Sequence, residues 1–406
     1  METRQVRFKL YPNQVQNEQL ESWNRLHCEL YNACLQERRD AYKKCGKSLT
    51  YYDQQNQLPA VKEARPEYKK LGSQALQETV RRVDRAYQGF FRRVKKGDTP
   101  GFPRFKSGRS YVGFTYPALA GWKFELGETG QHGTLNITHL GTIKARGKPR
   151  QWGEMRCLTL SKIGGEWYAT ITIRCTPKRQ AGMLAAGVDF GVARIASLSD
   201  GTPVENPRFL KKAMSKLKTL SRELARRKRF GSNWRRTKAQ IAKLHAKVAN
   251  QRANFQHQLT SDLVSQYGVL VTEDLSIKRM TAKGGASKTG LNRAILDVGM
   301  AGIIQKLACK ASEAGTLFLS VPTRLVKPSQ TCPACGNPSK KTLAERVHKC
   351  ECGYAEDRDV AAAQVMLQWA LANCQELAGR DTMAAPGRVS ELRNPDQTAL
   401  FAVGRG

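Results

Sequence analysis

The sequence predicts a multidomain α/β protein, in which a β-rich first half with a helical insertion precedes a second half of strands and helices. Three observations support this. Strand-like alternation surrounds helical periodicity in the first half, short apolar strands in the second half carry single acids, and two close cysteine pairs lie near the end. At 406 residues and 40% hydrophobic content, the chain has room for two or three domains with their own cores.

The first half opens with one strand and two long helices. Apolar and basic residues alternate over residues 4–11, as in a strand with one buried face. Apolar residues then recur at helical spacing from residue 13 to about 45, where Gly46 ends the run. A second helix is predicted over residues 73–94, and the arginines on its polar face are available for phosphate contacts.

Residues 100–116 read PGFPRFKSGRSYVGFTY, in which aromatic residues alternate with basic ones such as Arg104 and Lys106. Bases can stack on such rings while the cations hold the nucleic-acid backbone, although an ordinary loop and edge strand explain the composition equally well. Strand patterns follow at residues 133–144 and 156–175. We therefore expect a small β-barrel from residues 1–12 and 100–180, with a helical insertion at 13–99.

The net charge of +34 indicates a polyanionic partner, and nucleic acid is the common one. A basic membrane-surface protein is the competing idea, but the sequence has no long apolar span and no lipidation motif. The charge is most concentrated at residues 208–252, where two amphipathic helices are predicted with a break near Gly231 and Ser232 and Glu223 is the only acid. We expect this stretch to contact a nucleic-acid backbone rather than only solvent. The candidate contacts are Lys211, Lys212, Arg226, Arg227, Arg229, Arg235 and Arg236.

Three acids of the second half form a set. Asp189 interrupts an apolar strand, Glu273 ends a later strand, and Asp359 begins an alanine-rich helix that runs to about residue 377. A carboxylate inside a strand is costly unless it is paired or binds a metal, so a salt-bridged or capping Asp189 is the alternative. An RNase H-like sheet gathers its carboxylates in this order to hold two divalent metals for phosphodiester hydrolysis, and Mg²⁺ prefers such oxygen ligands. The predicted nuclease domain comprises residues 181–330 and 354–377.

Between these parts, residues 331–353 form a predicted zinc-binding insert. Cys332 and Cys335 form one close pair, and Cys350 and Cys352 form a second, Cys-x-Cys pair. Four thiolates in this arrangement suit one tetrahedral zinc. Four unrelated buried thiols, or a disulfide pair, are the alternatives. The lack of a signal peptide and the scatter of the remaining cysteines favour a reducing cytosol.

Four further segments complete the chain. A flexible turn rich in Lys283, Gly284, Gly285, Ser287 and Gly290 precedes a predicted helix from residue 292 to 314 and a strand at 316–321. The small and polar composition of residues 378–406 predicts a disordered tail.

Several segments together resemble the insertion-sequence protein family TnpB, over residues 4 to about 377. The segments are Val188-Asp189-Phe190-Gly191, Thr272-Glu273-Asp274-Leu275, Gly101-Phe102-Pro103-Arg104-Phe105-Lys106, Ser329-Gln330-Thr331-Cys332-Pro333-Ala334-Cys335-Gly336 and Asp357-Arg358-Asp359. Each motif alone is weak, but the full set in this order is specific.

This resemblance implies an RNA-guided DNA endonuclease related to the type V CRISPR effectors. Its RuvC-type nuclease lobe and zinc ribbon would follow a β-barrel wedge domain with a helical recognition insertion. A guide RNA from the transposon end would pair with target DNA beside a short adjacent motif, in the prokaryotic cytoplasm at the nucleoid, with the protein as a monomer on its guide.

The same resemblance implies roles for individual residues. Asp189, Glu273 and Asp359 correspond to the catalytic acids and the ligands of Mg²⁺ or Mn²⁺. Cys332, Cys335, Cys350 and Cys352 correspond to the Zn²⁺ ligands. Tyr51, Gln74, Gln77 and Thr115 fall in regions that contact the adjacent motif.

One departure from the family pattern lies beside the last acid. The family usually has Asp-x-Asn-Ala-Ala, whereas this chain has Ala361 at the Asn position. Because all three acids remain, we expect an active nuclease. The alternatives are a nuclease-inactive RNA-guided regulator, a miniature type V CRISPR nuclease, and a strand-joining transposase, although transposases usually order their acids Asp, Asp, Glu.

Overall fold

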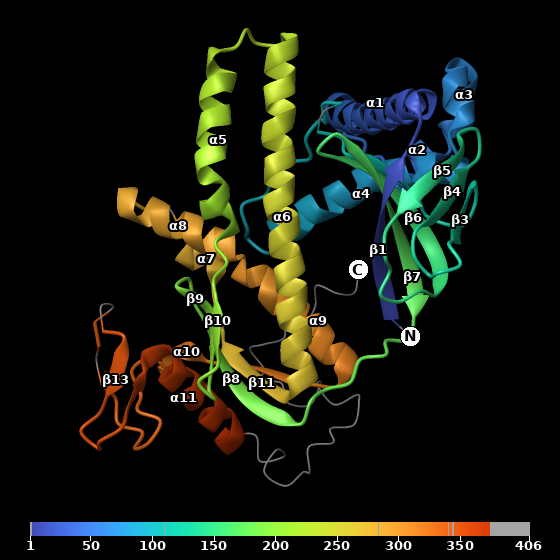
Figure 1. Ribbon diagram of the computed structural model, residues 1–406. Helices are drawn as coiled ribbons and strands as arrows, with labels where there is room; N and C mark the ends of the chain where they lie inside the picture. The colour runs from blue at the N-terminus through green and yellow to red at the C-terminus, as the bar shows by residue number, and fades with distance from the viewer. Residues whose placement is uncertain (1, 109, 283, 340, 343–344, 374–406) are drawn as a thin grey trace. The chain divides into compact units, whose positions relative to one another are not determined.

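The computed structural model describes residues 2–108, 110–282, 284–339, 341–342 and 345–373. The chain forms two compact units, the first spanning Met1–Pro177 and the second beginning at Lys178, and Figure 1 labels their elements. The predicted disordered tail lies outside the described residues. Among the described helices, none combines the length and apolar character needed to cross a membrane.

A seven-stranded antiparallel sheet forms the centre of the first unit. Its spatial order is β2-β6-β7-β1-β5-β4-β3, so the first strand of the chain lies in the middle of the sheet, between β7 and β5. The strands are β1 Glu2–Tyr11, β2 Gly113–Tyr116, β3 Trp122–Leu126, β4 Gly133–Ile137, β5 Gly141–Arg146, β6 Glu154–Ile163 and β7 Glu166–Cys175. This order leaves β2 and β3 at the two edges, so closure into a barrel stays a prediction.

The helices of the first unit lie between β1 and β2 in the sequence. They are α1 Gln14–Cys45, α2 Tyr51–Gln55, α3 Leu58–Ala64, the 3₁₀ helix Pro66–Lys70, and α4 Ser73–Lys95. Both predicted long helices are confirmed. Asn13 and Gln16 cap the start of α1 reciprocally, and Gly46 ends it at a φ of 62°. The shorter helices were not predicted, because one or two turns leave too little periodicity to detect.

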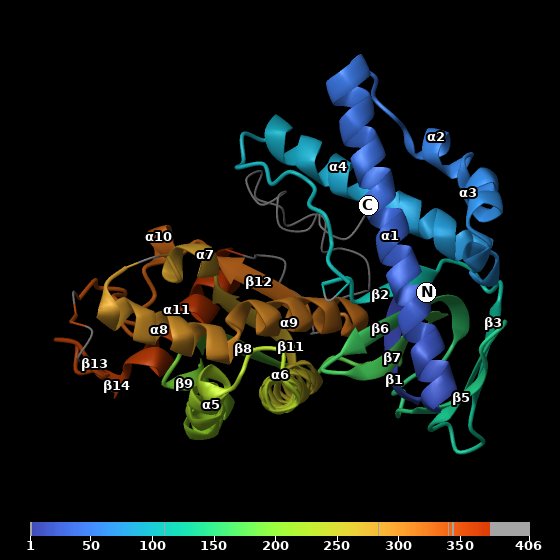
Figure 2. The same ribbon diagram turned by 90° about the horizontal axis from the view of Figure 1, so that it is seen from above.

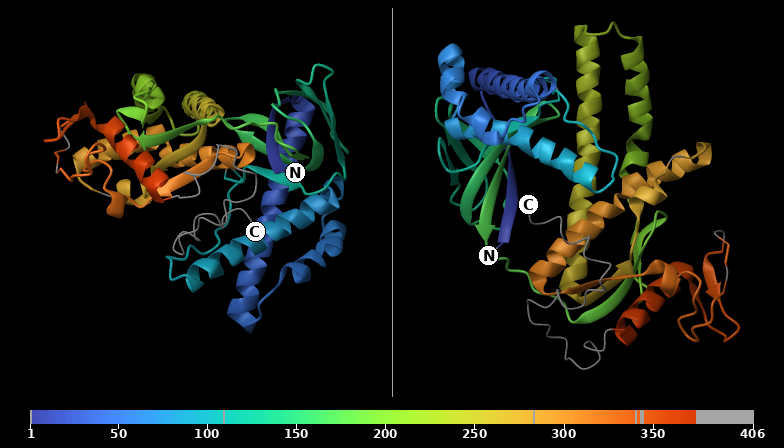
Figure 3. Two further views of the ribbon diagram at one scale, coloured as in Figure 1. Left: turned by 90° about the horizontal axis from the view of Figure 1, so that it is seen from below. Right: turned by 180° about the vertical axis from the view of Figure 1, so that it is seen from behind.

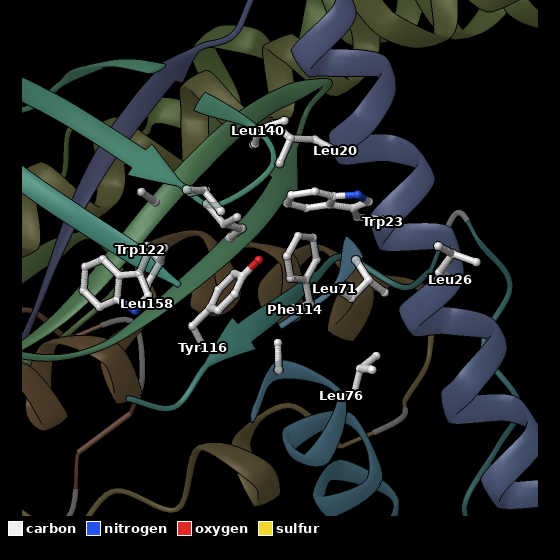
Figure 4. Packing of buried hydrophobic residues seen from close by; sticks show 14 of the residues in the cluster. Leu20, Trp23, Leu26, Leu71, Leu76, Phe114, Tyr116, Trp122, Leu140 and Leu158 are labelled. Atoms are coloured by element: carbon white, nitrogen blue, oxygen red, sulfur yellow. The ribbon is translucent and has the colours of Figure 1, made fainter. Parts of the chain in front are cut away.

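Helix α1 crosses α4 beside the sheet (Figure 2). Buried aromatic and leucine side chains pack between these helices and the sheet (Figure 4). Phe114 of β2 meets Trp23 of α1 edge-on, with 6.5 Å between the ring centroids. It also stacks on His27 of α1 at 4.5 Å. The buried His27 shares a 2.8 Å hydrogen bond with Thr79 of α4. These contacts hold the helical insertion on the sheet.

A five-stranded mixed sheet forms the centre of the second unit, in the order β10-β9-β8-β11-β12. The strands are β8 Leu184–Phe190, β9 Arg194–Leu198, β10 Pro203–Glu205, β11 Tyr267–Glu273 and β12 Leu317–Val321. Strand β9 is antiparallel to both β8 and β10, whereas β11 is parallel to both β8 and β12. The predicted strands at Asp189, Glu273 and residues 316–321 are confirmed.

The described helices of the second unit are α5 Phe209–Arg226, α6 Ser232–Gln266, α7 Ile277–Met280, α8 Ala286–Val298, α9 Met300–Ala314, α10 Thr323–Val326 and α11 Arg358–Asn373. The break near Gly231 and Ser232 is confirmed. The single helix predicted over residues 292–314 is wrong, because Gly299 takes a left-handed φ of 66° and separates α8 from α9. The predicted turn is also too long, since Gly290 lies inside α8.

Helices cover both faces of the second sheet. Leu270 of β11 packs with residues of α6 and α9 on one face. Its neighbours Val269 and Val271 pack on the opposite face with Ala363 and Met366 of α11. The second unit is therefore a three-layer α/β/α arrangement, from which α5 and the first part of α6 project as a hairpin (Figures 1 and 3).

Candidate active site and metal centre

Two of the predicted acids lie on neighbouring parallel strands at the same end of the sheet. Val188 of β8 is in register with Thr272 of β11, so Asp189 and Glu273 both follow the last paired position. Side chains alternate between the two faces of a strand. Since Val188 faces α6 and α9 and Val271 faces α11, Asp189 and Glu273 share the face that α11 covers.

Helix α11 brings the third acid to this face. It packs so closely on β8 that a Cβ atom at Gly187 would lie 1.8 Å from the carbonyl oxygen of Ala363. Only glycine permits this approach. Asp359 lies one helical turn before Ala363, on the same side of the helix, while Asp189 lies two residues beyond Gly187 on the strand. The Gly187 contact therefore places Asp359 near Asp189.

The electrostatics of the site agree with this placement. Burial, together with the nearby charges of Glu273 and Asp359, raises the pKa of Asp189 to about 8. Burial also raises the pKa of Glu273. Without a cation the charges of Glu273 and Asp359 oppose the ionisation of Asp189, and a bound divalent cation would relieve that repulsion. The donor set is all oxygen, which fits Mg²⁺ or Mn²⁺.

Asp357 acts on Asp359 through the backbone. Its Oδ1 atom accepts hydrogen bonds from the backbone N–H groups of Asp359, at 2.9 Å, and Val360, at 3.4 Å, so it caps the start of α11. Its Oδ2 atom accepts a 2.9 Å hydrogen bond from Arg194 of β9. The two acids of the Asp-Arg-Asp motif thus differ, because Asp357 fixes the helix start and Asp359 lies beside Asp189. The sequence signal for this cap was an Asp just before a helix, but nothing in the sequence indicated Arg194.

The four predicted zinc ligands converge. Their Sγ atoms all lie within 4.8 Å of one another. Cys332 and Cys352 are 3.7 Å apart between Sγ atoms, and Cys335 and Cys350 are 3.5 Å apart. A tetrahedral zinc with Zn–S bonds of about 2.3 Å would separate its sulfurs by about 3.8 Å. The thiols therefore fit one zinc ion, and these separations are too long for disulfides.

Backbone turns hold these thiols in place. The backbone N–H of Gly336, at a φ of 73°, donates to the carbonyl of Cys332 at 2.9 Å. Burial would raise the pKa of Cys332, but donation from the N–H groups of Cys335 and Ala334 lowers it to about 7. This favours the thiolate that a metal requires.

The second cysteine pair lies in the turn of a hairpin that leads directly into α11. Strands β13 Val347–Lys349 and β14 Ala355–Asp357 pair around Cys350 and Cys352, and Arg358 then begins the helix. Tyr354 of the hairpin donates a 2.6 Å hydrogen bond to Gln364 of α11. Gln364 in turn donates to the backbone carbonyl of Ser199, after β9, at 3.2 Å. The thiol cluster is thus attached to the helix that carries Asp359.

Two family models match separate parts of the second unit and the segment before it. The family model OrfB_IS605, described as "Probable transposase", matches residues 168–283. The model "Cas12f1-like, TNB domain" matches residues 301–366, a range that includes all four cysteines of the thiol cluster and Asp359. An Escherichia coli (strain K12) protein named as an RNA-guided DNA endonuclease, InsQ, is 32% identical over 310 residues, covering 73% of this chain and 74% of InsQ. The chain belongs to the TnpB family.

Two further similarities extend along the chain. A Streptomyces pristinaespiralis protein, also named as an RNA-guided DNA endonuclease, is 26% identical over 387 residues, covering 91% of this chain and 90% of the relative. The solved structure of CasPhi-2 (Cas12j) bound to crRNA covers 91% of this chain and 98% of its own at 10% identity, with a TM-score of only 0.45. The predicted family resemblance to TnpB is confirmed by the sequence relatives.

The basic residues predicted to contact nucleic acid in this TnpB-family chain lie on the α5–α6 hairpin. Six of the seven are exposed, namely Lys211, Lys212, Arg226, Arg229, Arg235 and Arg236. Arg227 differs, because it donates to the carbonyl of Asn233 at 2.8 Å and to the Thr237 hydroxyl, and it pairs with Glu223 at 3.3 Å. Its contacts join α5 to α6 within the hairpin.

The residues predicted to contact the adjacent motif are not equally accessible. Thr115 accepts a 2.8 Å hydrogen bond from Arg82 and shares one of 2.9 Å with Thr159, so it is engaged inside the unit. Tyr51 is buried, with the Arg81 guanidinium 4.8 Å from its ring centroid. On the first turns of α4, Gln74 is exposed and Gln77 is half-buried.

The loop that carries Arg104 and Lys106 is fixed at its backbone. Asn32 of α1 accepts from the N–H of Lys106 and donates to its carbonyl, both at 2.8 Å. The side chains of Arg104 and Lys106 are exposed. Phe105, also exposed, lies 5.2 Å from the Arg39 guanidinium. The loop therefore presents both cations to solvent from an anchored backbone.

Proposed function

We propose that this protein is an RNA-guided DNA endonuclease of a transposable element, which cleaves target DNA beside a short adjacent motif. The observation that carries the proposal is the convergence of Asp189, Glu273 and Asp359 on one face of the sheet in a TnpB-family chain. The relatives InsQ and the Streptomyces protein are named as RNA-guided DNA endonucleases.

The arrangement of the second unit supports an RNase H-like, RuvC-type nuclease. Three antiparallel strands are followed by two that extend the sheet in parallel, and acids lie at the ends of β8 and β11 and at the start of α11. In this proposal, residues 181–330 and 354–377 form the nuclease domain and 331–353 the zinc ribbon. Residues 1–12 and 100–180 form the wedge barrel, and 13–99 form the recognition insertion.

The three acids would hold Mg²⁺ or Mn²⁺. Divalent ions in such a site activate a water and stabilise the leaving oxygen of the cleaved phosphodiester. Asp189 contributes a carboxylate whose proton is lost when a cation binds, since its pKa is about 8 without one. Gly187 and Ala363 set the distance between strand and helix, and Asp357 with Arg194 fixes the helix start.

The zinc site has a structural role in this proposal. All four protein ligands are thiols, so a bound zinc keeps no open position for substrate. Its hairpin continues into α11, and Tyr354 attaches it to Gln364. Zinc would therefore stabilise the segment that delivers Asp359.

The partners in this proposal are a guide RNA from the transposon end and a target DNA, held by one copy of the protein. The charge of +34 and the exposed cations of the α5–α6 hairpin support a nucleic-acid partner. We assign adjacent-motif contacts to the region of Tyr51, Gln74, Gln77 and Thr115, where Gln74 is the most accessible side chain.

A miniature type V CRISPR nuclease is the second candidate, favoured by the match to the Cas12f1-like domain over residues 301–366. Both candidates share the same chemistry and differ in the source of the guide. Sequencing the RNA that copurifies with the protein distinguishes them, because a transposon-end transcript and a CRISPR repeat transcript differ. A preparation free of bound RNA would contradict both.

The decisive experiment measures Mg²⁺-dependent cleavage of a matched double-stranded DNA by the purified RNA–protein complex. Asp189→Ala is the control for contaminating nucleases. We expect cleavage by the wild type and none by the variant or in EDTA. Target binding without cleavage above the control, at any divalent metal, would contradict the nuclease proposal and leave an RNA-guided regulator.

A further inference from the structure

The tip of the α5–α6 hairpin carries two aromatic side chains among cations. Phe230 and Trp234 lie 5.5 Å apart between ring centroids, and Phe230 is 48% exposed. The Arg229 guanidinium lies 5.0 Å from the Phe230 ring, and the Lys238 ammonium lies 4.9 Å from the Trp234 ring. The tip lies at the end of the hairpin farthest from the sheet of its unit (Figures 1 and 3).

The charge around these rings has a single sign. Residues 226–238 contain no acid, and their basic residues are Arg226, Arg227, Lys228, Arg229, Arg235, Arg236 and Lys238. Such a surface attracts a polyanion. Phe230 is exposed and Trp234 is half-buried. The combination of cations with accessible aromatic rings is the one that single-stranded nucleic-acid sites use, since the cations hold phosphates while bases stack on the rings. A protein partner would not require this excess of cations, nor would a duplex require accessible rings.

The backbone at Phe230 adopts an unusual conformation for an aromatic residue. Its φ is 68°, a left-handed conformation that bulky L-residues rarely adopt and that glycine adopts freely. Glycine stands at the next position, where φ is −69°, a value that L-residues adopt without backbone strain. The chain thus keeps an aromatic residue where folding favours glycine. Strain of this kind collects at functional sites.

The hairpin is also joined by contacts other than the one between the two rings. Arg227 connects the end of α5 to Asn233 and Thr237 of α6 and pairs with Glu223. The backbone N–H of Gly231 donates to the carbonyl of Lys228 at 3.1 Å and closes the turn. Replacing the rings therefore leaves the turn and its anchor in place.

We propose that Phe230 and Trp234 form a stacking site for an unpaired base, with the adjacent cations holding the phosphates that flank it. The inference rests on the proposed function, since it requires a nucleic-acid partner, and it assigns that partner a single-stranded segment at the hairpin tip. The strand comes either from RNA or from DNA, because both present the same base face and phosphate.

The test measures binding by fluorescence anisotropy with the full chain and oligonucleotides of about 20 residues. The probes are oligothymidylate, oligouridylate and an abasic strand with the same phosphate backbone. The variants are Phe230→Gly and Trp234→Ala. Phe230→Tyr keeps a ring, and Lys228→Gln removes one charge but keeps both rings.

We expect the wild type to bind the base-containing strands about tenfold more tightly than the abasic strand. Phe230→Gly and Trp234→Ala should lose most of this preference, whereas Phe230→Tyr keeps it. Lys228→Gln should weaken binding to all three probes by a similar factor. The melting temperature of Phe230→Gly should equal or exceed that of the wild type, whereas a ring that only stabilised the hairpin would make it fall.

A base preference that stays unchanged in both Phe230→Gly and Trp234→Ala would overturn the stacking site. That result is distinct from failure of the proposed function, in which the wild type binds none of the probes. A loss of preference seen only with oligouridylate assigns the site to RNA. A loss of preference seen only with oligothymidylate assigns the site to DNA. A loss of preference with both probes shows that the site accepts RNA and DNA alike.

Discussion

The four thiols and the three carboxylates of the second unit are both metal-ligand clusters, but the chain builds them differently. The thiols come from one short segment, in which two turns bring their sulfurs within 4.8 Å. The carboxylates come from β8, β11 and α11, which meet only through strand register and helix packing. One cluster is local, and the other depends on the whole unit.

The difference has an energetic counterpart. Thiols that fit one zinc gain folding free energy from the metal, because an unfolded chain does not hold the four ligands together. The buried carboxyl of Asp189 opposes folding without a metal, as its raised pKa indicates. We therefore expect the thiol cluster to support stability and the acid cluster to support chemistry at some cost in stability.

The largest expected effect comes from Asp189→Asn, which removes a charge but keeps the shape of the side chain. Cleavage should fall by at least about a thousandfold, because a metal ligand is lost. The melting temperature of the metal-free protein should stay the same or rise, because a neutral amide avoids the cost of burying an acid beside Glu273 and Asp359. Paired measurements of cleavage rate and thermal unfolding check this, and a large drop in melting temperature would contradict it.

Cys350→Ser should affect stability and cleavage together. Zinc content, measured by mass spectrometry of the metal, should fall to near zero, and the β13–β14 hairpin should become sensitive to protease. Cleavage should fall about 10- to 100-fold, since the hairpin leads into α11. Cys309→Ser, at an exposed cysteine outside the cluster, is the matched control. A stable variant with full activity and no zinc would show that zinc is dispensable.

Asp357 links the two clusters, because it lies in the hairpin that carries two of the thiols and also positions the acid Asp359. Asp357→Ala removes the helix cap and the contact with Arg194, and we expect about tenfold slower cleavage. Asp357→Asn should retain most activity, because Asn also caps helices. Guide-RNA affinity should be unchanged in both variants, and Glu205→Gln, at the longer 3.7 Å contact of Arg194, should have no effect. Equal losses in Asp357→Ala and Asp357→Asn would assign the effect to charge alone.

The Mg²⁺ requirement should depend on pH. With a pKa of about 8 for metal-free Asp189, a proton competes with the cation below that pH, so the half-saturating Mg²⁺ concentration should rise by up to about tenfold for each unit of acidification. Titrations of cleavage rate with Mg²⁺ between about pH 6.5 and 8.5 measure this. A requirement that does not change with pH would contradict the carboxylate coupling.

The raised pKa of Asp189 also determines how the stability of the metal-free protein changes with pH. The folded pKa of Asp189 lies above its ordinary value of 3.8, so between these values the folded chain holds a proton that the unfolded chain has lost. Its contribution to stability is therefore lost as pH rises toward 8. Urea unfolding in EDTA should show this loss in the wild type but not in Asp189→Asn.

The smallest expected effect on cleavage concerns Ala361, where the family usually has Asn. Ala361 is 1% exposed, so Ala361→Asn would bury an amide and should cost about 1–3 kcal/mol in stability unless it finds a partner. We expect cleavage to change by less than about tenfold, because the three acids already supply the ligand set. A gain of more than about tenfold would show that the missing amide had limited this enzyme.

Local sequence features predicted much of the fold. Asn13 and Gly46 bound α1, because helix capping and a left-handed glycine act within a few residues. Gly231 precedes α6 as its N-cap residue. Gly299 and Gly290 show the limit of this approach. Only Gly299 takes the left-handed conformation that ends a helix, while Gly290 stays inside α8. Composition does not distinguish them, because their conformations depend on the surrounding packing.

The cysteine cluster could be identified from the spacing of its residues, because a short turn keeps the two thiols of each pair close together in space. The acids could be proposed from their order along the chain, but their meeting required the register of β8 with β11 and the contact of Gly187 with Ala363. The separate positions of Asp357 and Asp359, and the engagement of Arg227 within the hairpin, also depended on partners far along the chain or across a turn. The physical reason is the range of the interactions: turns and caps act over a few residues, whereas the surroundings of a carboxylate or a guanidinium are set by segments that only folding brings together.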